Sequence, residues 1–109
     1  MPKITLSGIP KESMAAIAPR LVRSVAEILD CPQHWISLEW VPSAYFDASG
    51  ETQHCPMMEI YWFQRPPEIM KATASAISDI FADEGYPHII IQIMDTLREN
   101  YFDITKEAT

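Results

Sequence analysis

Residues 57–70 read MMEIYWFQRPPEIM, and this stretch predicts a strand that turns directly into a helix. Ile60 and Trp62 lie on one side of the predicted strand and alternate with other side chains, which is typical of a strand with one buried face. The two prolines that follow end the strand, and proline is well tolerated in the first turn of a helix. We therefore expect the apolar face of this strand to pack against the helix that follows it.

Residues 1–14, MPKITLSGIPKESM, show the same pattern 56 positions earlier. Ile4 and Leu6 alternate with polar residues there, again as in a half-buried strand. A shift of 56 positions superposes Met1 on Met57, Ile4 on Ile60, Pro10 on Pro66, Glu12 on Glu68 and Met14 on Met70. The identities are few, but the pattern of strand and helix repeats with them, so we expect two similar halves.

Each half continues with an amphipathic helix and then a second strand. Apolar side chains recur at helical spacing over 14–29 and over 69–81. The second strands are expected at 35–41 and 88–94, where apolar residues alternate or run continuously. The tail after Arg98 is expected to add a short strand, YFDI.

These elements predict an α+β fold, in which two β-α-β halves form one four-stranded sheet with both helices on the same face. We interpret residues 1–109 as a single domain, with pseudo-repeats at 1–41 and 57–94. The segment 42–56 is rich in turn residues and is expected to be a connecting loop. Neither half could bury its sheet alone, so the two halves should share one core.

The strand pattern gives the predicted sheet two different faces. The face toward the helices is expected to carry Ile4, Leu6, Ile36, Leu38, Trp40, Ile60, Trp62, Ile89, Ile91 and Ile93. The opposite face is expected to carry Ser37, Glu39, Glu59, Tyr61, Phe63, Arg65, Ile90 and Gln92. That second face suits neither water nor a core, which favours self-association, and three such sheets could close around an axis as a homotrimer.

The composition argues against several classes of function. The net charge is −7 and the few Lys and Arg residues are scattered, which argues against binding to nucleic acid or to anionic membranes. The chain shows no signal-peptide core and no membrane-spanning run, and Cys31 and Cys55 form no disulfide framework, so we expect a cytoplasmic protein. His34, His54 and His88 lack metal-site spacing, and neither a metal nor a cofactor is expected.

Pro2 suggests a particular chemistry, because initiator methionine is normally removed when the next residue is small. The mature chain would then begin with a secondary amine, and the reference pKa of a terminal amine is about 8. Apolar surroundings and a nearby cation both lower that pKa toward the neutral range in which a general base works best. The alternative is that Pro2 merely begins the first strand.

The N-terminal proline, the two β-α-β halves and the chain length together resemble the tautomerase superfamily, in the long form that includes macrophage migration inhibitory factor. The resemblance covers nearly the whole chain: CPQHWISLEWVP (31–42) is similar to the start of that protein's second strand, and HIIIQIMD (88–95) to its fourth strand. Trp62-Phe63-Gln64-Arg65 is similar to a W-F-x-R pattern in uncharacterised bacterial members.

The resemblance implies a homotrimer with active sites between subunits, in which a terminal proline acts as general base or acid. Pro2 would then catalyse keto–enol tautomerisation of a small 2-oxo acid, as an isomerase. Arg65 lies near where family members hold a substrate carboxylate, and Phe63 lies where they have an apolar pocket wall. Gln92 falls where macrophage migration inhibitory factor has an asparagine contributed by the neighbouring subunit.

Glu39 is a further candidate, because Glu39 and Glu59 are the acids predicted to lie inside strands. They could provide a general acid for hydration or decarboxylation, or they could form ion pairs between subunits. The chain also departs from the family. Cys31 stands where macrophage migration inhibitory factor has a pocket lysine, and Met58 replaces the second cysteine of its C-x-x-C motif, so a thiol-oxidoreductase activity is not supported.

Three alternatives stay open at this point. Arg65 could be structural, paired with Glu59 or Glu39 at the end of its strand. The protein could be a catalytically inactive trimeric binding protein of the same fold, and a retained Met1 would favour this because it acylates the proline nitrogen. An active enzyme could carry out tautomerisation, decarboxylation or hydration, and the sequence does not name the substrate.

Overall fold

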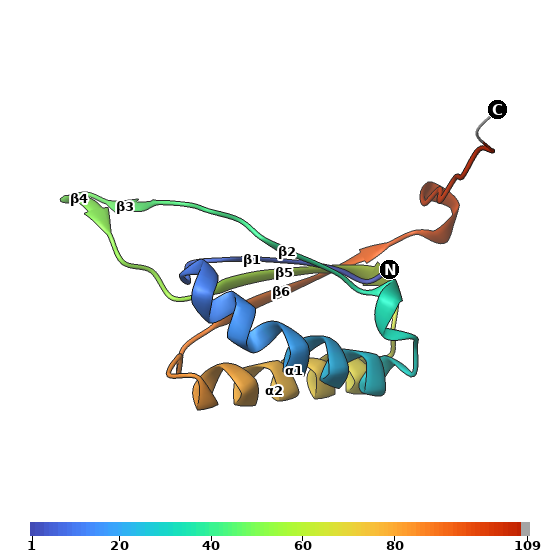
Figure 1. Cartoon of the computed structure of the whole chain (residues 1–109), viewed down its shortest axis with the longest axis horizontal. Helices are drawn as coiled ribbons and strands as arrows, with labels where there is room; N and C mark the ends of the chain where they lie inside the picture. The colour runs from blue at the N-terminus through green and yellow to red at the C-terminus, as the bar shows by residue number, and fades with distance from the viewer. Residues whose placement is uncertain (108–109) are drawn as a thin grey trace.

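The computed structural model describes residues 1–107 and shows one layer of sheet covered by one layer of helices (Figure 1). The strands are β1 (Lys3–Ser7), β2 (Ser37–Trp40), β3 (Tyr45–Asp47), β4 (Gly50–Thr52), β5 (Met57–Phe63) and β6 (Ile90–Thr96). The helices are α1 (Lys11–Leu29) and α2 (Pro67–Asp83), and 3-10 turns occupy Gln33–Trp35 and Arg98–Asn100. The expected order of strand, helix and strand therefore occurs in both halves.

The main sheet has the strand order β2-β1-β5-β6. β1 runs parallel to β2 and β5 runs parallel to β6, because a helix connects the members of each pair and returns the chain to the same end of the sheet. The central strands β1 and β5 are antiparallel, with Ile4 opposite Ile60. The predicted α+β fold with two β-α-β halves is confirmed.

Both helices lie on the same face of this sheet (Figure 1), and the core fills the space between the two layers. Ile4, Leu6, Ile60 and Trp62 are completely buried there. Every side chain expected on this face belongs to the core or packs against it, and Met58 on β5 joins them. The period of two identified this face because successive strand side chains point to opposite sides of the sheet.

Proline and glycine set the ends of α2. Pro66 precedes the helix in an extended conformation, and Pro67 occupies its first turn as predicted. Gly85 follows the helix in the left-handed conformation, with φ of 91°. The N–H of Tyr86 can then donate to the carbonyl of Phe81 at 2.8 Å, which satisfies one of the last carbonyls of the helix.

The connecting segment carries a hairpin of β3 and β4, which we call the arm, and the arm stands away from the rest of the molecule (Figure 1). At its root the Tyr45 hydroxyl is hydrogen-bonded to the Ser7 hydroxyl. The Tyr45 ring also stacks on His54, with ring centroids 4.5 Å apart. A two-stranded hairpin is only marginally stable in water, so these contacts at the root help to hold the arm in place.

The tail differs from the sequence prediction. A strand is expected at 101–104, but the 3-10 turn at Arg98–Asn100 is followed by chain without regular structure up to residue 107. This segment leads away from the sheet (Figure 1), and none of the described strands pairs with it. A strand needs a partner for its backbone groups, and a single chain provides none here, so the predicted strand is wrong.

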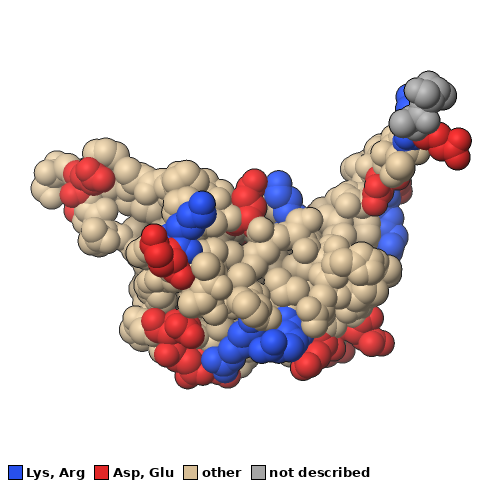
Figure 2. Space-filling model, viewed as in Figure 1, with Lys and Arg blue, Asp and Glu red and all other residues tan. Residues whose placement is uncertain are grey.

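The helical side of the molecule carries both acidic and basic side chains (Figure 2). In the described part of the chain one ion pair is found, and it joins the two helices: Arg20 Nη1 lies 2.8 Å from Asp83 Oδ2. Both side chains are exposed, so the pair contributes only about 0–1 kcal/mol. None of the helices within residues 1–107 is long and apolar enough to cross a membrane.

Candidate active site

The start of β1 and the end of β5 lie side by side, because these neighbouring strands are antiparallel. Lys3 is opposite Tyr61, so the next positions outward bring Pro2 and Phe63 to the same end of the sheet. Pro2 is buried, and its carbonyl accepts a hydrogen bond from the N–H of Ser37 at 3.0 Å. Strand register thus places two of the predicted site residues at the same end of the sheet, where Pro2 is next to Trp62 rather than to Phe63.

A hollow of about 530 Å³, which we call the N-terminal hollow, opens at this end of the sheet. It is lined by Met1, His34, Trp35, Ser37, Tyr101 and Asp103. Its volume lies within the range of about 300–1,000 Å³ that is typical of small-molecule sites, and its walls offer imidazole, hydroxyl and carboxylate groups. Because Met1 is bonded to the Pro2 nitrogen and forms one wall, removal of Met1 would open that nitrogen to this space.

The ring of Phe63 organises the tail at the same end of the sheet. Tyr101 meets Phe63 edge to face, with ring centroids 5.2 Å apart, and the Arg98 guanidinium lies 4.2 Å from the Phe63 centroid. A cation over an exposed aromatic ring is worth about 0.5–1 kcal/mol. These contacts hold the turn at 98–100 against the sheet, and the tail then contributes Tyr101 and Asp103 to the N-terminal hollow.

Arg65 lies two residues past the end of β5 and is half-buried, immediately before the two prolines. The sequence leaves open an ion pair with Glu59 or Glu39, but neither pair forms within residues 1–107. Glu59 instead accepts a hydrogen bond from the Tyr61 hydroxyl at 2.8 Å. Arg65 is also not among the residues that line the N-terminal hollow of a single chain.

Glu39 and Gln92 lie on the uncovered face of the sheet, away from the hollow. Thr5 is opposite both Glu39 and Glu59, and Glu59 is opposite Gln92, so these side chains form one row across the sheet. A strand rises about 3.3 Å per residue, which places the row roughly 10 Å from the level of Pro2. One chain therefore does not bring Glu39 or Gln92 to Pro2.

Five residues at this end were not singled out as site residues by the sequence: His34, Trp35, Ser37, Arg98 and Asp103. The first two belong to the turn at Gln33–Trp35, just before β2. Ser37 begins β2, Arg98 begins the turn at 98–100, and Asp103 lies in the tail where a strand was expected and chain without regular structure is found. One sequence feature could have indicated these tail residues. Because β5 and β6 are parallel and end together, the tail that follows β6, with its aromatic residues, begins at the end of the sheet where Pro2 lies.

Within residues 1–107 the pKa values of two side chains, Tyr61 and Asp47, are clearly shifted, and neither side chain lines the hollow. The hydrogen bond to Glu59 raises the pKa of the Tyr61 phenol, with help from desolvation and from the Glu59 charge. The pKa of Asp47 in the arm is lowered, first by the side-chain hydrogen bond from Ser49 and then by the backbone N–H of Ser49. The shifted pKa of the hydrogen-bonded pair Glu59 and Tyr61 therefore belongs to the uncovered face and not to the N-terminal hollow.

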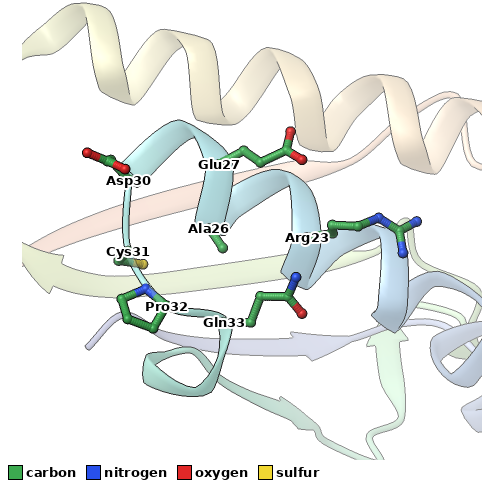
Figure 3. A pocket seen from close by; sticks show the side chains of 7 residues that line it. All are labelled: Arg23, Ala26, Glu27, Asp30, Cys31, Pro32 and Gln33. Atoms are coloured by element: carbon green, nitrogen blue, oxygen red, sulfur yellow. The ribbon is translucent and has the colours of Figure 1, made fainter.

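A second hollow, of about 490 Å³, lies where α1 ends and includes Cys31 (Figure 3). It is lined by Arg23, Ala26, Glu27, Asp30, Cys31, Pro32 and Gln33. The cation of this lining is Arg23, and Figure 3 shows its guanidinium directed away from the Cys31 thiol. The position at which the resemblance implies a pocket lysine is thus occupied by a thiol without a cation beside it.

The sequence matches the model of a family described as a domain of unknown function, DUF1904, over residues 1–106. The chain belongs to the DUF1904 family. No curated protein matches it. The match includes Pro2, the whole sheet and the tail residues that line the N-terminal hollow, so this hollow lies inside the family's domain.

Solved structures share this fold. A DUF1904 domain from Sebaldella termitidis has a TM-score of 0.88 at 22% identity, covering 94% of this chain and 95% of that chain. Pt0534 inactivated by 2-oxo-3-pentynoate has a TM-score of 0.74 at 16% identity, covering 91% and 89%. A macrophage migration inhibitory factor-like protein from Entamoeba histolytica has a TM-score of 0.71 at 15% identity, covering 94% and 93%. Identities this low establish the fold alone, and at that level the resemblance to the tautomerase superfamily is confirmed.

Proposed function

We propose that this protein is a tautomerase-type enzyme, an isomerase that moves a proton between carbon and oxygen of a small 2-oxo acid. The observation that carries the proposal is that Pro2 and Phe63 lie at the same end of the sheet as the N-terminal hollow, one wall of which is Met1, the residue bonded to the Pro2 nitrogen. Inactivation of Pt0534 by 2-oxo-3-pentynoate, in a protein of the same fold, supports 2-oxo acids as the substrate class.

Pro2 is the catalytic residue of this proposal, and Met1 is removed in the active form. In the enol-to-keto direction, the Pro2 nitrogen takes the enol hydroxyl proton and the electron pair of that O–H bond forms the carbonyl. The electron pair of the C=C bond then takes a proton at carbon, which protonated Pro2 returns. In this proposal, the apolar ring of Phe63 and the positive charge of Arg65 lower the pKa of the Pro2 amine, so that the free base is populated near neutral pH.

Arg65 is proposed to bind the substrate carboxylate, since its planar guanidinium can donate two parallel hydrogen bonds to a carboxylate. Phe63 does not line the hollow of a single chain, and it is proposed to complete the apolar wall beside the substrate together with the Tyr101 ring that it meets edge to face. Tyr101 lines the hollow, and its hydroxyl is proposed to donate a hydrogen bond to the substrate carbonyl oxygen. The substrate would thus be held at its carboxylate by Arg65 and at its carbonyl oxygen by Tyr101.

We also propose a homotrimer with shared active sites, in which Gln92 and Glu39 of a neighbouring subunit approach Pro2. Support comes from the uncovered face, where these side chains lie too far from Pro2 of their own chain. The acidic charge and the two free cysteines support a cytoplasmic protein whose partners are small molecules and other copies, rather than nucleic acid or membranes.

The first experiment asks whether the proline nitrogen is available. The intact mass of the native protein should correspond to a chain that begins at Pro2, and this protein should accelerate the enol–keto conversion of phenylpyruvate. A native mass that includes Met1, together with the absence of turnover, would instead favour the second candidate: a trimeric binding protein of the same fold in which the proline is acylated.

The decisive variant is Pro2→Ala, which keeps an N-terminal amine but removes the secondary one. We expect kcat/KM to fall by about 10²–10⁴-fold, the usual contribution of a positioned base, while circular dichroism and the melting temperature stay near those of the wild type. Pro87→Ala changes an exposed proline between α2 and β6 and serves as the matched control. Equal turnover by Pro2→Ala and the wild type would reduce Pro2 to a strand-start residue.

A further inference from the structure

Pro2 lies in a row of residues that crosses the sheet at the end where the N-terminal hollow opens, and Figure 1 shows the N-terminus at this end. The N–H of Ser37 donates to the Pro2 carbonyl, so the pairing of β1 with β2 continues outward past Lys3. On the other side of β1, the register places Trp62 next to Pro2, and Asp95 is opposite Trp62. Across β2, β1, β5 and β6 the row therefore reads Ile36, Pro2, Trp62 and Asp95.

The side chains of this row point to the face of the sheet that the helices cover. Pro2 is two positions before Ile4, which is completely buried there, and side chains two apart on a strand share a face. Pro2 and Ile36 are themselves buried, and Trp62 has no exposed surface. No charged side chain within residues 1–107 is buried, so Pro2 lies between two apolar side chains with no buried charge beside it.

The Trp62 indole is oriented by one hydrogen bond, in which its N–H donates to Asp95 Oδ1 at 3.2 Å. β1 and β6 flank β5 on opposite sides, so this bond directs the one polar atom of the Trp62 side chain away from Pro2. The part of the ring nearer Pro2 is then carbon. A buried donor without an acceptor is unfavourable, so without Asp95 the indole would have to turn or admit water.

Asp95 has two effects of opposite sign on an amine at Pro2. By holding the carbon surface of Trp62 beside Pro2 and excluding water, it disfavours the ammonium form and lowers the pKa of the amine. Its negative charge favours the ammonium form and raises that pKa. Neighbouring strands lie about 4.8 Å apart, so β6 is roughly 10 Å from β1, and the charge of an exposed carboxylate acts weakly at this distance.

We propose that Asp95 is a positioning residue for Pro2: its carboxylate fixes the Trp62 indole with carbon toward Pro2 and thereby keeps water from the amine. The inference rests on the proposed function of Pro2, because it concerns the amine that removal of Met1 exposes. Other charged or titratable groups at this end of the sheet are Lys3, His34, Arg65, Arg98, Tyr101 and Asp103. They act on the same amine, but they are unchanged among the variants of Asp95 and Trp62 compared below.

The test uses the full chain beginning at Pro2 and measures the pKa of its terminal amine directly, by nitrogen NMR with labelled proline. Asp95→Asn removes the charge but keeps an oxygen acceptor for the indole, whereas Asp95→Leu removes both, so the difference between them isolates the hydrogen bond. We expect the amine pKa to be about one unit higher in Asp95→Leu than in Asp95→Asn, because water beside the amine favours its charged form. The acidic limb of the pH–rate profile with phenylpyruvate should move equally, lowering kcat/KM about tenfold below that limb through kcat rather than KM.

Trp62→Phe keeps an aromatic ring but removes the donor, so in that background Asp95→Leu and Asp95→Asn should give equal amine pKa values. Asp79→Leu makes the same substitution at an exposed position of α2 and is the matched control, with an unchanged amine pKa expected. Equal pKa values for the two Asp95 variants beside an intact Trp62, even with a lowered melting temperature, would make Asp95 merely structural and overturn the proposal. A difference that persists in Trp62→Phe would also overturn it. Absence of turnover with the expected pKa difference would defeat the proposed function and leave the positioning role standing.

Discussion

The two faces of the sheet are made by the same strands but have opposite character. On the covered face, Leu6, Ile60 and Trp62 are completely buried under the helices. On the uncovered face, Thr5, Glu39, Glu59 and Gln92 form a polar row, and apolar side chains flank it: Met57 and Ile90 on one side and Tyr61 and Met94 on the other. The covered face is completed by its own chain, whereas the uncovered face mixes carboxylates with apolar groups that a monomer leaves in water.

The two faces are expected to contribute to different processes, the covered face to folding of the subunit and the uncovered face to association of subunits. Burial of a large apolar side chain contributes about 1.5–3 kcal/mol, and on the covered face this gain is obtained within one subunit. On the uncovered face Ile90 is 39% exposed, so part of the comparable gain is still available. We therefore expect changes on the covered face to alter the stability of the subunit, and changes on the uncovered face to alter association and the environment of the polar row.

The largest expected effect is that of Trp62→Ala on the covered face. Truncating a fully buried tryptophan leaves a cavity and should lower the free energy of unfolding by about 3–5 kcal/mol. It also removes the hydrogen bond from the Trp62 indole N–H to Asp95 at 3.2 Å. Tyr61→Ala, one position away on the other face, is the matched control in denaturant unfolding. Equal losses for the two variants would contradict the distinction between the faces.

Association is tested by Ile90→Lys on the uncovered face. A lysine there opposes burial of this edge of the face, so we expect the dissociation constant of the proposed trimer to rise tenfold or more, with an unchanged core. Light scattering over a range of concentrations measures the effect. Ser78→Lys on the exposed side of α2 adds the same charge away from the face. A wild-type protein that is monomeric at micromolar concentration would remove both the trimer and its shared active sites.

A smaller effect is expected for Arg65→Ala, just past the strand that forms the uncovered face. Because a carboxylate contact exists in the ground state and the transition state alike, the variant should mainly raise KM, about tenfold, with kcat near that of the wild type. Loss of a cation near Pro2 would raise the pKa of its amine, so the acidic limb of the pH–rate profile should move to higher pH. Gln64→Ala changes the exposed neighbour and is the control.

A merely structural Arg65 would give the opposite result. Its removal would then lower the melting temperature or weaken association, because an ion pair with Glu59 or Glu39 of another subunit would be lost. KM and the pH profile would stay near those of the wild type. Measuring both kinetic quantities and the melting temperature on one variant distinguishes the two roles.

The parts of the structure that follow from local pattern were predictable from sequence. Ile60 and Trp62 could be assigned to the covered face because the strand period is two. The start of α2 could be assigned because Pro66 and Pro67 end the strand and proline is well tolerated in the first turn of a helix. The end of the sheet that Pro2 and Phe63 share depends on the antiparallel register of β1 and β5, which the local pattern did not give. Strand period and proline position were thus sufficient for the elements that pack against the core of their own chain.

The wrong and missed predictions concern segments whose packing partners cannot be inferred from the local sequence pattern. Phe102 and Ile104 alternate like strand residues, yet they stay exposed because no described strand lies beside them. The wall that Asp103 contributes to the N-terminal hollow depends on contacts between segments distant in sequence, since Phe63 on β5 holds Arg98 and Tyr101 of the tail. Helical or strand period carries no information on such contacts.

The smallest expected effect concerns the titration of Tyr61 on the uncovered face. The hydrogen bond to Glu59 raises the pKa of the Tyr61 phenol above its ordinary value of 10.0. Glu59→Gln removes the charge that opposes the phenolate, so the pKa should fall back toward that value. Because the chain has four tyrosines, the ultraviolet titration is measured as the difference between each protein and the same protein carrying Tyr61→Phe.

The same titration shows whether the face is covered in solution. The phenol pKa is raised in the folded state, so its stabilising contribution is complete below pH 10 and is lost as pH rises through the folded pKa. If subunits cover the polar row, desolvation raises the pKa further, and Ile90→Lys should partly reverse this rise along with association. A Tyr61 pKa that is unchanged by both Glu59→Gln and Ile90→Lys would show that the Glu59–Tyr61 hydrogen bond is absent in solution.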